Sequence, residues 1–180
     1  CRVIGVQAAG APSMAESLKK GKIITLSSVD TIADGIKVKT PGDLTFGMCR
    51  QYVDDVVTVT EGEIASAILT VLEKQKLVAE GAGAVGIAAA MYHKANIEGK
   101  NVCALLSGGN VDVTTLSRVI TKGLSKAGRI VELTTKVPDK PGGLLQMLRV
   151  VADSGANILT VNHAREHSHS EVAACTVTMV

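Results

Sequence analysis

The chain has 180 residues, of which 46% are hydrophobic and 20% are charged, and its formal net charge is +2. This length suffices for one ordinary domain and a small second one. So small a charge excess argues against binding to nucleic acid or to an anionic membrane surface. The only aromatic side chains are Phe46, Tyr52 and Tyr92, which argues against a surface that stacks single-stranded bases. Every apolar run is interrupted before it reaches the length of a membrane span.

The four cysteines, Cys1, Cys49, Cys103 and Cys175, show no CxxC spacing. Since disulfides persist mainly in oxidising compartments, we expect reduced, buried thiols in a cytoplasmic protein. Cys1 opens directly into a strand-like run, without an initiator Met or a signal peptide, and Val180 lies inside another such run. We therefore expect a fragment of a longer chain.

The first 127 residues alternate between short apolar runs and helical patterns. Such alternation is typical of an α/β layer with a parallel sheet. Thr60, followed by Glu63, predicts a capping box at a helix start. The predicted strands cover 2–8, 53–59 and 101–106, and the predicted helices cover 14–20, 44–52, 61–76, 80–90 and 113–126. Ser13 is the expected cap of the first helix, and Gly21 is its expected end.

The stretch 101–110 joins an apolar run to Ser107, Gly108, Gly109 and Asn110. A buried strand there would deliver Ser107 to the carboxyl edge of the sheet, which is where open α/β sheets bind ligands. The two glycines lack the Cβ atoms that would prevent a ligand from approaching the backbone closely. Ser107 and Asn110 are also favourable helix caps, so the pattern fits a plain strand-to-helix turn as well as a ligand site.

Residues 80–90 consist mostly of Gly and Ala. They predict a closely packed apolar helix with Glu80 near its positive end. Gly81, Gly83 and Gly86 have the spacing of a dinucleotide-binding motif. That motif requires a strand directly before it, and the apolar run before Glu80 is too short, so we do not expect a dinucleotide site.

The alternation of short apolar runs with helical patterns ends near residue 128. The following residues predict a strand, a turn, a helix and two further strands, which is half of a ferredoxin-like unit. The strands are predicted over 129–137, 156–163 and 171–180, and the helix over 144–154. We therefore expect one domain over 1–127 and a second over 128–180.

Neither a metal site nor a catalytic pair is evident in the sequence. His163, His167 and His169 lie in a polar stretch without a cysteine or a cluster of acids beside it, which favours a solvated loop over a metal site. No nucleophile or general base has an evident partner. If the chain is part of an enzyme, its reactive group lies outside these residues or on a cofactor.

Four motifs carry a family resemblance: TIADGI (31–36), VDDVVTVTEGEI (53–64), EGAGAVG (80–86) and LLSGGNVD (105–112). In this order they resemble the C-terminal half of the threonine dehydratases (threonine ammonia-lyases). These are fold-type II, tryptophan synthase β-like pyridoxal-phosphate enzymes, as are serine dehydratases and serine racemase. Residues 129–180 resemble the start of an ACT regulatory domain. The resemblance implies part of a parallel-sheet catalytic domain, followed by a truncated ferredoxin-like (ACT) α+β domain.

The implied reaction is β-elimination of water from L-threonine or L-serine, which yields 2-oxobutanoate or pyruvate together with ammonia. The family's Schiff-base lysine and phosphate loop have no match here, so the fragment alone is expected to be inactive. Ser107 matches the hydroxyl that hydrogen-bonds the pyridine nitrogen, and Gly108 and Gly109 give the ring room. Gly35 matches a glycine that borders the ring, and Glu80 matches an acid near its polar edge.

Relatives with a divalent-cation site carry acids where this chain has Gln7 and Ser13. The resemblance therefore gives no metal site here. It also implies a cytoplasmic homo-oligomer.

One turn in this second domain matches the place where ACT domains bind amino-acid effectors. It consists of Pro141, Gly142, Gly143 and Leu144. Free backbone N–H groups at the start of the following helix would meet the polar groups of isoleucine or valine. Two alternatives to threonine dehydratase stay open. One is a serine dehydratase or racemase with the same cofactor, and the other is a non-catalytic regulatory module that binds amino acids.

Overall fold

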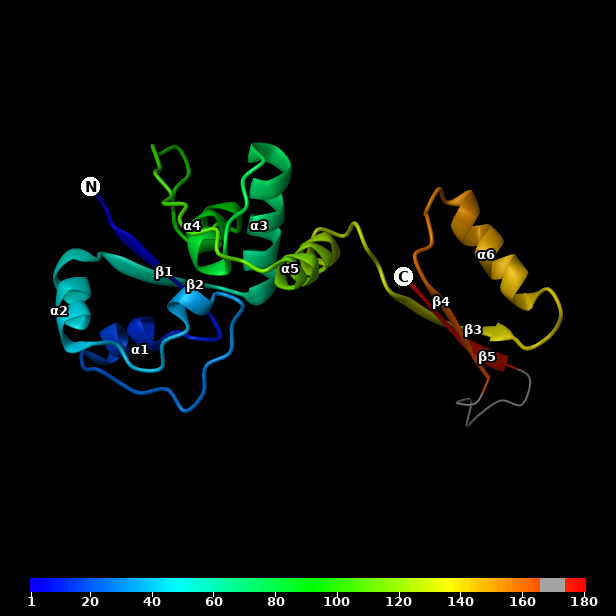
Figure 1. The fold of residues 1–180 in the computed structure, drawn as a ribbon, viewed down its shortest axis with the longest axis horizontal. Helices are drawn as coiled ribbons and strands as arrows, with labels where there is room; N and C mark the ends of the chain where they lie inside the picture. The colour runs from blue at the N-terminus through cyan, green and yellow to red at the C-terminus, as the bar shows by residue number, and fades with distance from the viewer. Residues whose placement is uncertain (166–173) are drawn as a thin grey trace. The chain divides into compact units, whose positions relative to one another are not determined.

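The computed structural model describes residues 1–165 and 174–180. The chain forms two compact units, Cys1–Ala127 and Gly128–Val180 (Figure 1). His167, His169 and the first three residues of the strand predicted over 171–180 lie outside the described residues.

The larger unit is built on two parallel strands, β1 (Ile4–Ala8) and β2 (Asp55–Val59). Figure 1 shows α1 and α2 on one side of these strands and α3 and α4 on the other. This arrangement confirms the predicted α/β class with parallel strands. The helices are α1 (Ser13–Lys20), α2 (Asp43–Tyr52), α3 (Glu61–Gln75), α4 (Gly81–Met91) and α5 (Val113–Lys126), with a short 3-10 helix η1 (Asp34–Ile36).

The predicted capping box at the start of α3 is confirmed. The Glu63 backbone N–H donates to the Thr60 hydroxyl at 3.4 Å, and the Thr60 N–H donates to Glu63 Oε2 at 2.8 Å. The other carboxylate oxygen of Glu63 lies 2.9 Å from the Lys94 ammonium. Burial by itself would raise the pKa of Glu63. The hydrogen bond from the Thr60 backbone and the Lys94 charge outweigh it, so that pKa lies below its usual value.

Two other caps differ from expectation. The N-cap of α1 is Pro12, and Ser13 is the buried first residue of the helix, so Ser13 does not cap it. The N-cap of α5 is Asp112, whose carboxylate accepts a hydrogen bond from the Thr115 N–H at 2.9 Å. Because Asp112 directly precedes the first helical residue, it takes the role that the sequence offered to Ser107 and Asn110.

The predicted buried strand over 101–106 is wrong for the described part of the chain. These residues form neither a strand nor a helix, and Leu105 is 80% exposed. A strand requires a ladder of hydrogen bonds to a neighbour, and β1 and β2 are the only strands described in this unit. Leu106 alone packs partly against the core.

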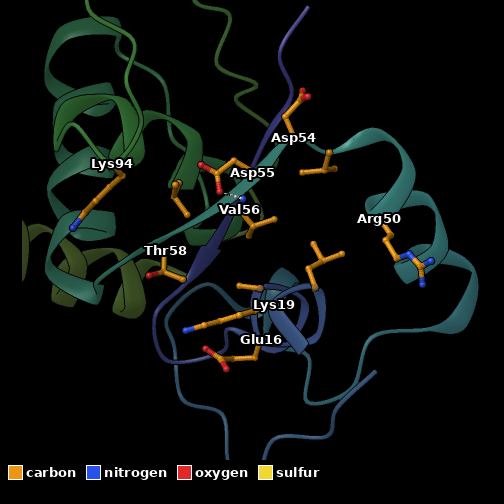
Figure 2. Close-up of a pocket in the computed structure, with 12 residues that line it drawn as sticks. Glu16, Lys19, Arg50, Asp54, Asp55, Val56, Thr58 and Lys94 are labelled. Atoms are coloured by element: carbon orange, nitrogen blue, oxygen red, sulfur yellow. Dashed lines mark hydrogen bonds between the residues drawn. The ribbon is translucent and has the colours of Figure 1, made fainter. Parts of the chain in front are cut away.

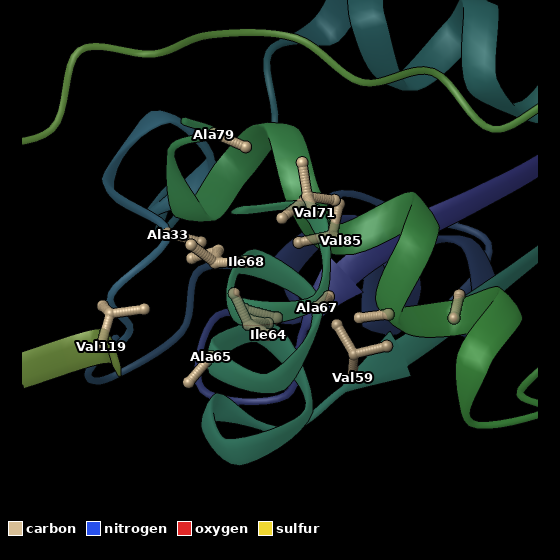
Figure 3. Close-up of a cluster of buried hydrophobic side chains, with 14 residues drawn as sticks. Ala33, Val59, Ile64, Ala65, Ala67, Ile68, Val71, Ala79, Val85 and Val119 are labelled. Atoms are coloured by element: carbon tan, nitrogen blue, oxygen red, sulfur yellow. The ribbon is translucent and has the colours of Figure 1, made fainter. Parts of the chain in front are cut away.

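The core of the larger unit lies between α3, α4 and β2, with Val59, Ile64 and Ile68 at its centre (Figure 3). Helices α3 and α5 approach closely at Gly123, where a Cβ atom would lie 2.8 Å from the Ala65 carbonyl oxygen. No helix in the described part of the chain is long and apolar enough to cross a membrane.

All four cysteines are free, but the expectation that all are buried is wrong. Cys175 is buried, Cys49 is half-buried, and Cys1 and Cys103 are exposed. Cys103 is exposed because the predicted strand around it does not form.

The smaller unit is an antiparallel sheet with the strand order β3-β5-β4 and one helix, α6 (Gly143–Asp153). The strands are β3 (Leu133–Pro138), β4 (Val161–Ala164) and β5 (Ala174–Met179). Central β5 buries alternate side chains, Cys175, Val177 and Met179, and the apolar face of α6 packs against them. The predicted order of strand, helix, strand and strand is present.

We predict that Glu63→Gln destabilises the larger unit at pH 7 by about 1.5–3 kcal/mol, which is typical of a lost hydrogen bond to a charged group. Glutamine can still complete the capping box, so the variant isolates the charge. Because the pKa of Glu63 is lowered on folding, its contribution is complete above the ordinary glutamate value of 4.5 and is lost at lower pH.

Urea unfolding between pH 7 and pH 3 measures this dependence, with exposed Glu98→Gln as the control. A stability difference between Glu63→Gln and the parent chain that stayed constant over this range would contradict the assignment.

Candidate functional site

Three segments that are far apart in the sequence meet at the N-terminus of α4. The backbone N–H of its N-cap, Glu80, donates to the Gly108 carbonyl at 3.3 Å. A Cβ atom on Gly108 would overlap the Glu80 side chain, and one on Gly35 would lie 3.5 Å from Glu80 Oε1. The structure thus brings together Gly35, Glu80 and Gly108, which the sequence marked as site residues.

Ser107 is held against the same helix by its backbone. A Cβ atom on Gly83 would overlap the Ser107 carbonyl oxygen, so this contact requires glycine at position 83. Gly108 has a φ of +72°, a left-handed conformation that glycine adopts at little cost. Ser107, Gly108 and Gly109 are all exposed, and the Ser107 hydroxyl has no hydrogen-bond partner within residues 1–165 and 174–180. That hydroxyl is available to a ligand.

Glu61 fixes the loop that carries Gly35. Its Oε2 accepts a hydrogen bond from the Ile32 backbone N–H at 2.7 Å, and its Oε1 is buried without a partner among the described residues. Nothing in the sequence singles out Glu61, because an acid in the first turn of a helix is ordinarily a favourable dipole contact. Its fixed position beside residue 32 depends on tertiary packing.

The space enclosed around Gly35 and Glu80 is small. A cavity of about 80 Å³ is lined by both residues and by Asn110. Sites that enclose a small molecule usually measure about 300–1,000 Å³. This space is therefore too small to enclose such a molecule by itself, and a ligand at Ser107 would need further walls.

A larger cavity of about 810 Å³ contains none of the predicted site residues (Figure 2). Its lining includes Glu16 and Lys19 of α1, Arg50 of α2 and the consecutive residues 53–58. Successive residues of a strand point to opposite faces, so a space that borders all of them runs along the edge of β2. An open strand edge of this kind is able to pair with a further strand.

The predicted effector turn borders a separate cavity in the smaller unit. Pro141, Gly142 and Leu144 line this cavity of about 270 Å³. Gly143 does not line it, and instead packs so closely that a Cβ atom there would overlap the Pro138 carbonyl oxygen. Gly142 is the N-cap of α6 and has a φ of +88°.

Gln7 and Ser13, which stand in place of the expected acids, have structural contacts. The Gln7 side-chain oxygen accepts a hydrogen bond from the Ala15 N–H at 2.8 Å, and Ser13 is buried. A different group of potential metal ligands lies in the smaller unit, where ligand atoms of Asp139, His163 and Cys175 lie within 4.8 Å of one another. The sequence placed His163 only within a polar stretch that favoured a solvated loop, and it missed Asp139 and Cys175, which fold beside it.

The larger unit is thus an α/β unit in which glycines at the N-terminus of α4 lie beside Ser107, whose exposed hydroxyl has no partner among the described residues. Residues 1–108 match the family model described as "Pyridoxal-phosphate dependent enzyme". The chain belongs to this family, whose cofactor is pyridoxal phosphate.

Curated relatives and solved structures agree with this family. The chain is 52% identical over 164 residues to an L-threonine ammonia-lyase of Thermotoga maritima and 48% identical over 165 residues to one of Geobacter sulfurreducens. Each alignment covers 91% of this chain and 41% of the relative, so the chain spans about two fifths of the relatives' length.

Two solved structures share the fold. Threonine deaminase isoform 2 of Solanum lycopersicum matches with a TM-score of 0.62 and 38% identity, over 67% of this chain and 34% of that one. Maize serine racemase matches with a TM-score of 0.59 and 37% identity, over 71% of this chain and 40% of the racemase.

We predict opposite effects for two alanine substitutions in α4. Gly83→Ala places a Cβ atom on the Ser107 carbonyl, which must move, and should cost about 1–3 kcal/mol of unfolding free energy. In Gly86→Ala the new Cβ atom would lie 3.5 Å from the Leu105 carbonyl oxygen, which is an ordinary contact. This variant should be neutral or stabilise the helix by up to about 1 kcal/mol. Urea unfolding of the two variants and the parent chain measures both values. Equal stability of the two variants would refute the close contact.

Proposed function

We propose that this chain forms the C-terminal part of a pyridoxal-phosphate-dependent L-threonine ammonia-lyase. The whole protein would convert threonine to 2-oxobutanoate and ammonia by β-elimination. The observation that carries the proposal is the exposed Ser107 hydroxyl beside Gly108 and Glu80, which has no partner in residues 1–165 or 174–180. The 52% identity to an L-threonine ammonia-lyase over 91% of this chain supports the choice of reaction.

The residues present fit a flat pyridine ring. Gly108 and Gly109 carry no side chains beside Ser107, so a planar group is able to approach the backbone there. Pyridoxal phosphate, when bound, supplies the electron sink that makes elimination from an amino acid accessible. The lysine and the phosphate loop that hold the cofactor in the family would come from the remainder of the full-length protein, so the 180 residues alone should be inactive.

Ser107 would provide a neutral hydrogen bond to the ring nitrogen. A hydroxyl is able to donate or accept a hydrogen bond without carrying charge, whereas a carboxylate at this position would stabilise a proton on that nitrogen. Serine therefore moderates electron withdrawal by the ring and favours elimination over transamination. The fixed Ser107 carbonyl against Gly83 limits where this hydroxyl can point.

Glu80 would contribute a carboxylate at the polar edge of the ring. Its side chain is half-buried against Gly35 and Gly108 and has no ion pair or hydrogen bond within the described part of the chain. Glu80 is thus able to orient a polar substituent of the ring, while Glu61 holds the Gly35 loop in place.

The first alternative is a serine dehydratase or racemase, favoured by the 37% identity to maize serine racemase. Turnover of L-threonine and L-serine by the full-length protein, with a chiral assay for D-serine, separates these activities. The second alternative is a non-catalytic module that binds amino acids. Isoleucine binding by a full-length protein that binds no pyridoxal phosphate would support that module.

We predict that Ser107→Ala in the full-length protein lowers kcat/KM for threonine by about fivefold, because one hydrogen bond of about 1 kcal/mol is lost. Ser107→Asp should lower it further and shift the visible absorbance of the bound cofactor, because the carboxylate changes protonation at the ring nitrogen. Ser125→Ala, an exposed serine of α5, is the matched control. Unchanged absorbance and turnover in both Ser107 variants would remove Ser107 from the site.

We further propose that the smaller unit is an ACT-type regulatory domain of a homo-oligomer that binds isoleucine or valine at residues 141–144. Support comes from the cavity of about 270 Å³ beside this turn and from the N-terminus of α6 that adjoins it. The Gly143 N–H already donates to the Lys140 carbonyl at 3.0 Å, so an effector carboxylate would bind the N–H groups of the following residues at the helix start.

We predict that Gly143→Ala lowers isoleucine affinity at least about tenfold, because the new Cβ atom overlaps the Pro138 carbonyl and displaces the turn. Gly155→Ala is the control, since it alters a glycine with a φ of +78° at the other end of α6. Calorimetric titration of the full-length protein measures both affinities. An equal loss of isoleucine affinity in the two variants would mean that the effector does not bind at residues 141–144.

A further inference from the structure

We propose that Asp139, His163 and Cys175 bind a single divalent transition-metal ion of the zinc class. Asp139 follows β3, His163 lies on β4, and Cys175 lies on β5, so the three strands of the smaller unit converge on this point. One ligand atom from each residue lies within 4.8 Å of the other two. The site lies in the smaller unit and does not rest on the proposed activity.

The ligand atoms match the chemistry of zinc. Imidazole nitrogen, thiolate sulfur and carboxylate oxygen are its usual protein ligands, whereas calcium and magnesium prefer oxygen alone. His163 Nε2 lies 2.8 Å from Cys175 Sγ. Zinc–nitrogen and zinc–sulfur distances of about 2.0 and 2.3 Å place such atoms about 3.5 Å apart in a tetrahedron. Entry of the ion thus requires these two atoms to separate by less than about 1 Å.

Binding would replace two hydrogen bonds of the Cys175 thiol with three coordinate bonds. The contacts of Cys175 Sγ with His163 Nε2 and with the Val137 carbonyl, at 3.5 Å, both break. The thiol proton is released to solvent, since zinc binds the thiolate. Bonds from sulfur, imidazole nitrogen and a carboxylate oxygen to the ion then form, without oxidation or reduction. Cys175 is 1% exposed, and a buried thiolate is favourable only where a positive charge compensates it.

The surroundings provide the remaining requirements of a metal site. Asp139 and His163 line the cavity of about 270 Å³, so water has room to act as a fourth ligand. Arg165 Nε donates to Asp139 Oδ1 at 3.1 Å, which orients the carboxylate as outer-shell groups commonly do. The guanidinium also adds a positive charge, which lowers affinity without blocking the second carboxylate oxygen.

An ion here would connect the strand before the turn 141–144 to β4 and β5. Asp139 begins the loop that leads to this turn. A coordinated Asp139 would restrict the loop and thereby rigidify the cavity that Pro141 and Leu144 also line. The metal site and the proposed effector site would then be coupled, although the metal site does not require the effector.

Cobalt(II) titration of the full chain, monitored by absorbance, tests the proposal. A cobalt–thiolate charge-transfer band should appear and saturate at one ion per chain, and zinc should abolish it by competition. Cys175→Ser should eliminate the band, and His163→Gln and Asp139→Asn should each weaken cobalt binding at least about tenfold. Cys49→Ser and His93→Gln are matched controls, and both should bind as the parent chain does.

Absence of the band in the parent chain would overturn the proposal, as would its persistence in Cys175→Ser. Because Cys175 belongs to the core, circular dichroism establishes whether its variant folds. If that variant does not fold, His163→Gln decides the question, because His163 is exposed and its replacement leaves the core unchanged. Parent-like cobalt affinity in His163→Gln would then refute the site.

Discussion

Close contact between backbone segments holds the N-terminus of α4 against its neighbours, and the larger unit's candidate site depends on it. Gly83 packs on the Ser107 carbonyl, and Gly81 lies against the backbone of residues 32–33. A Cβ atom at either of these glycines would lie too close to the facing backbone atoms. Side-chain packing elsewhere in the core tolerates small changes in volume, but a backbone contact leaves no side chain that could rotate away.

The sequence predicted those parts of the fold whose signals are local. The capping box of Thr60 and Glu63 needs only residues within one helical turn, and it forms as expected. The parallel pairing of β1 and β2 followed from the alternation of strands and helices. The strand predicted over 101–106 failed because a strand also needs a neighbour, which composition cannot supply. The exposure of Cys103 has the same cause.

The candidate site residues show the same difference between signals that the sequence carries and contacts that only tertiary packing creates. Four ordered motifs that resemble one family singled out Ser107, Gly108, Gly35 and Glu80, and any one of the motifs alone would have been weak. Glu61 was missed because its partner, the Ile32 N–H, lies far from it in the sequence. The group around Cys175 depends on strand register, since antiparallel pairing of β4 with β5 brings His163 beside that cysteine. Register of this kind follows from tertiary packing.

β2 leaves one edge without a strand partner among the described residues. The groove of about 810 Å³ runs along this edge at residues 53–58. An unpaired strand edge is a template on which strands of other chains can assemble. This edge is therefore a point at which the larger unit is prone to aggregate unless it is covered.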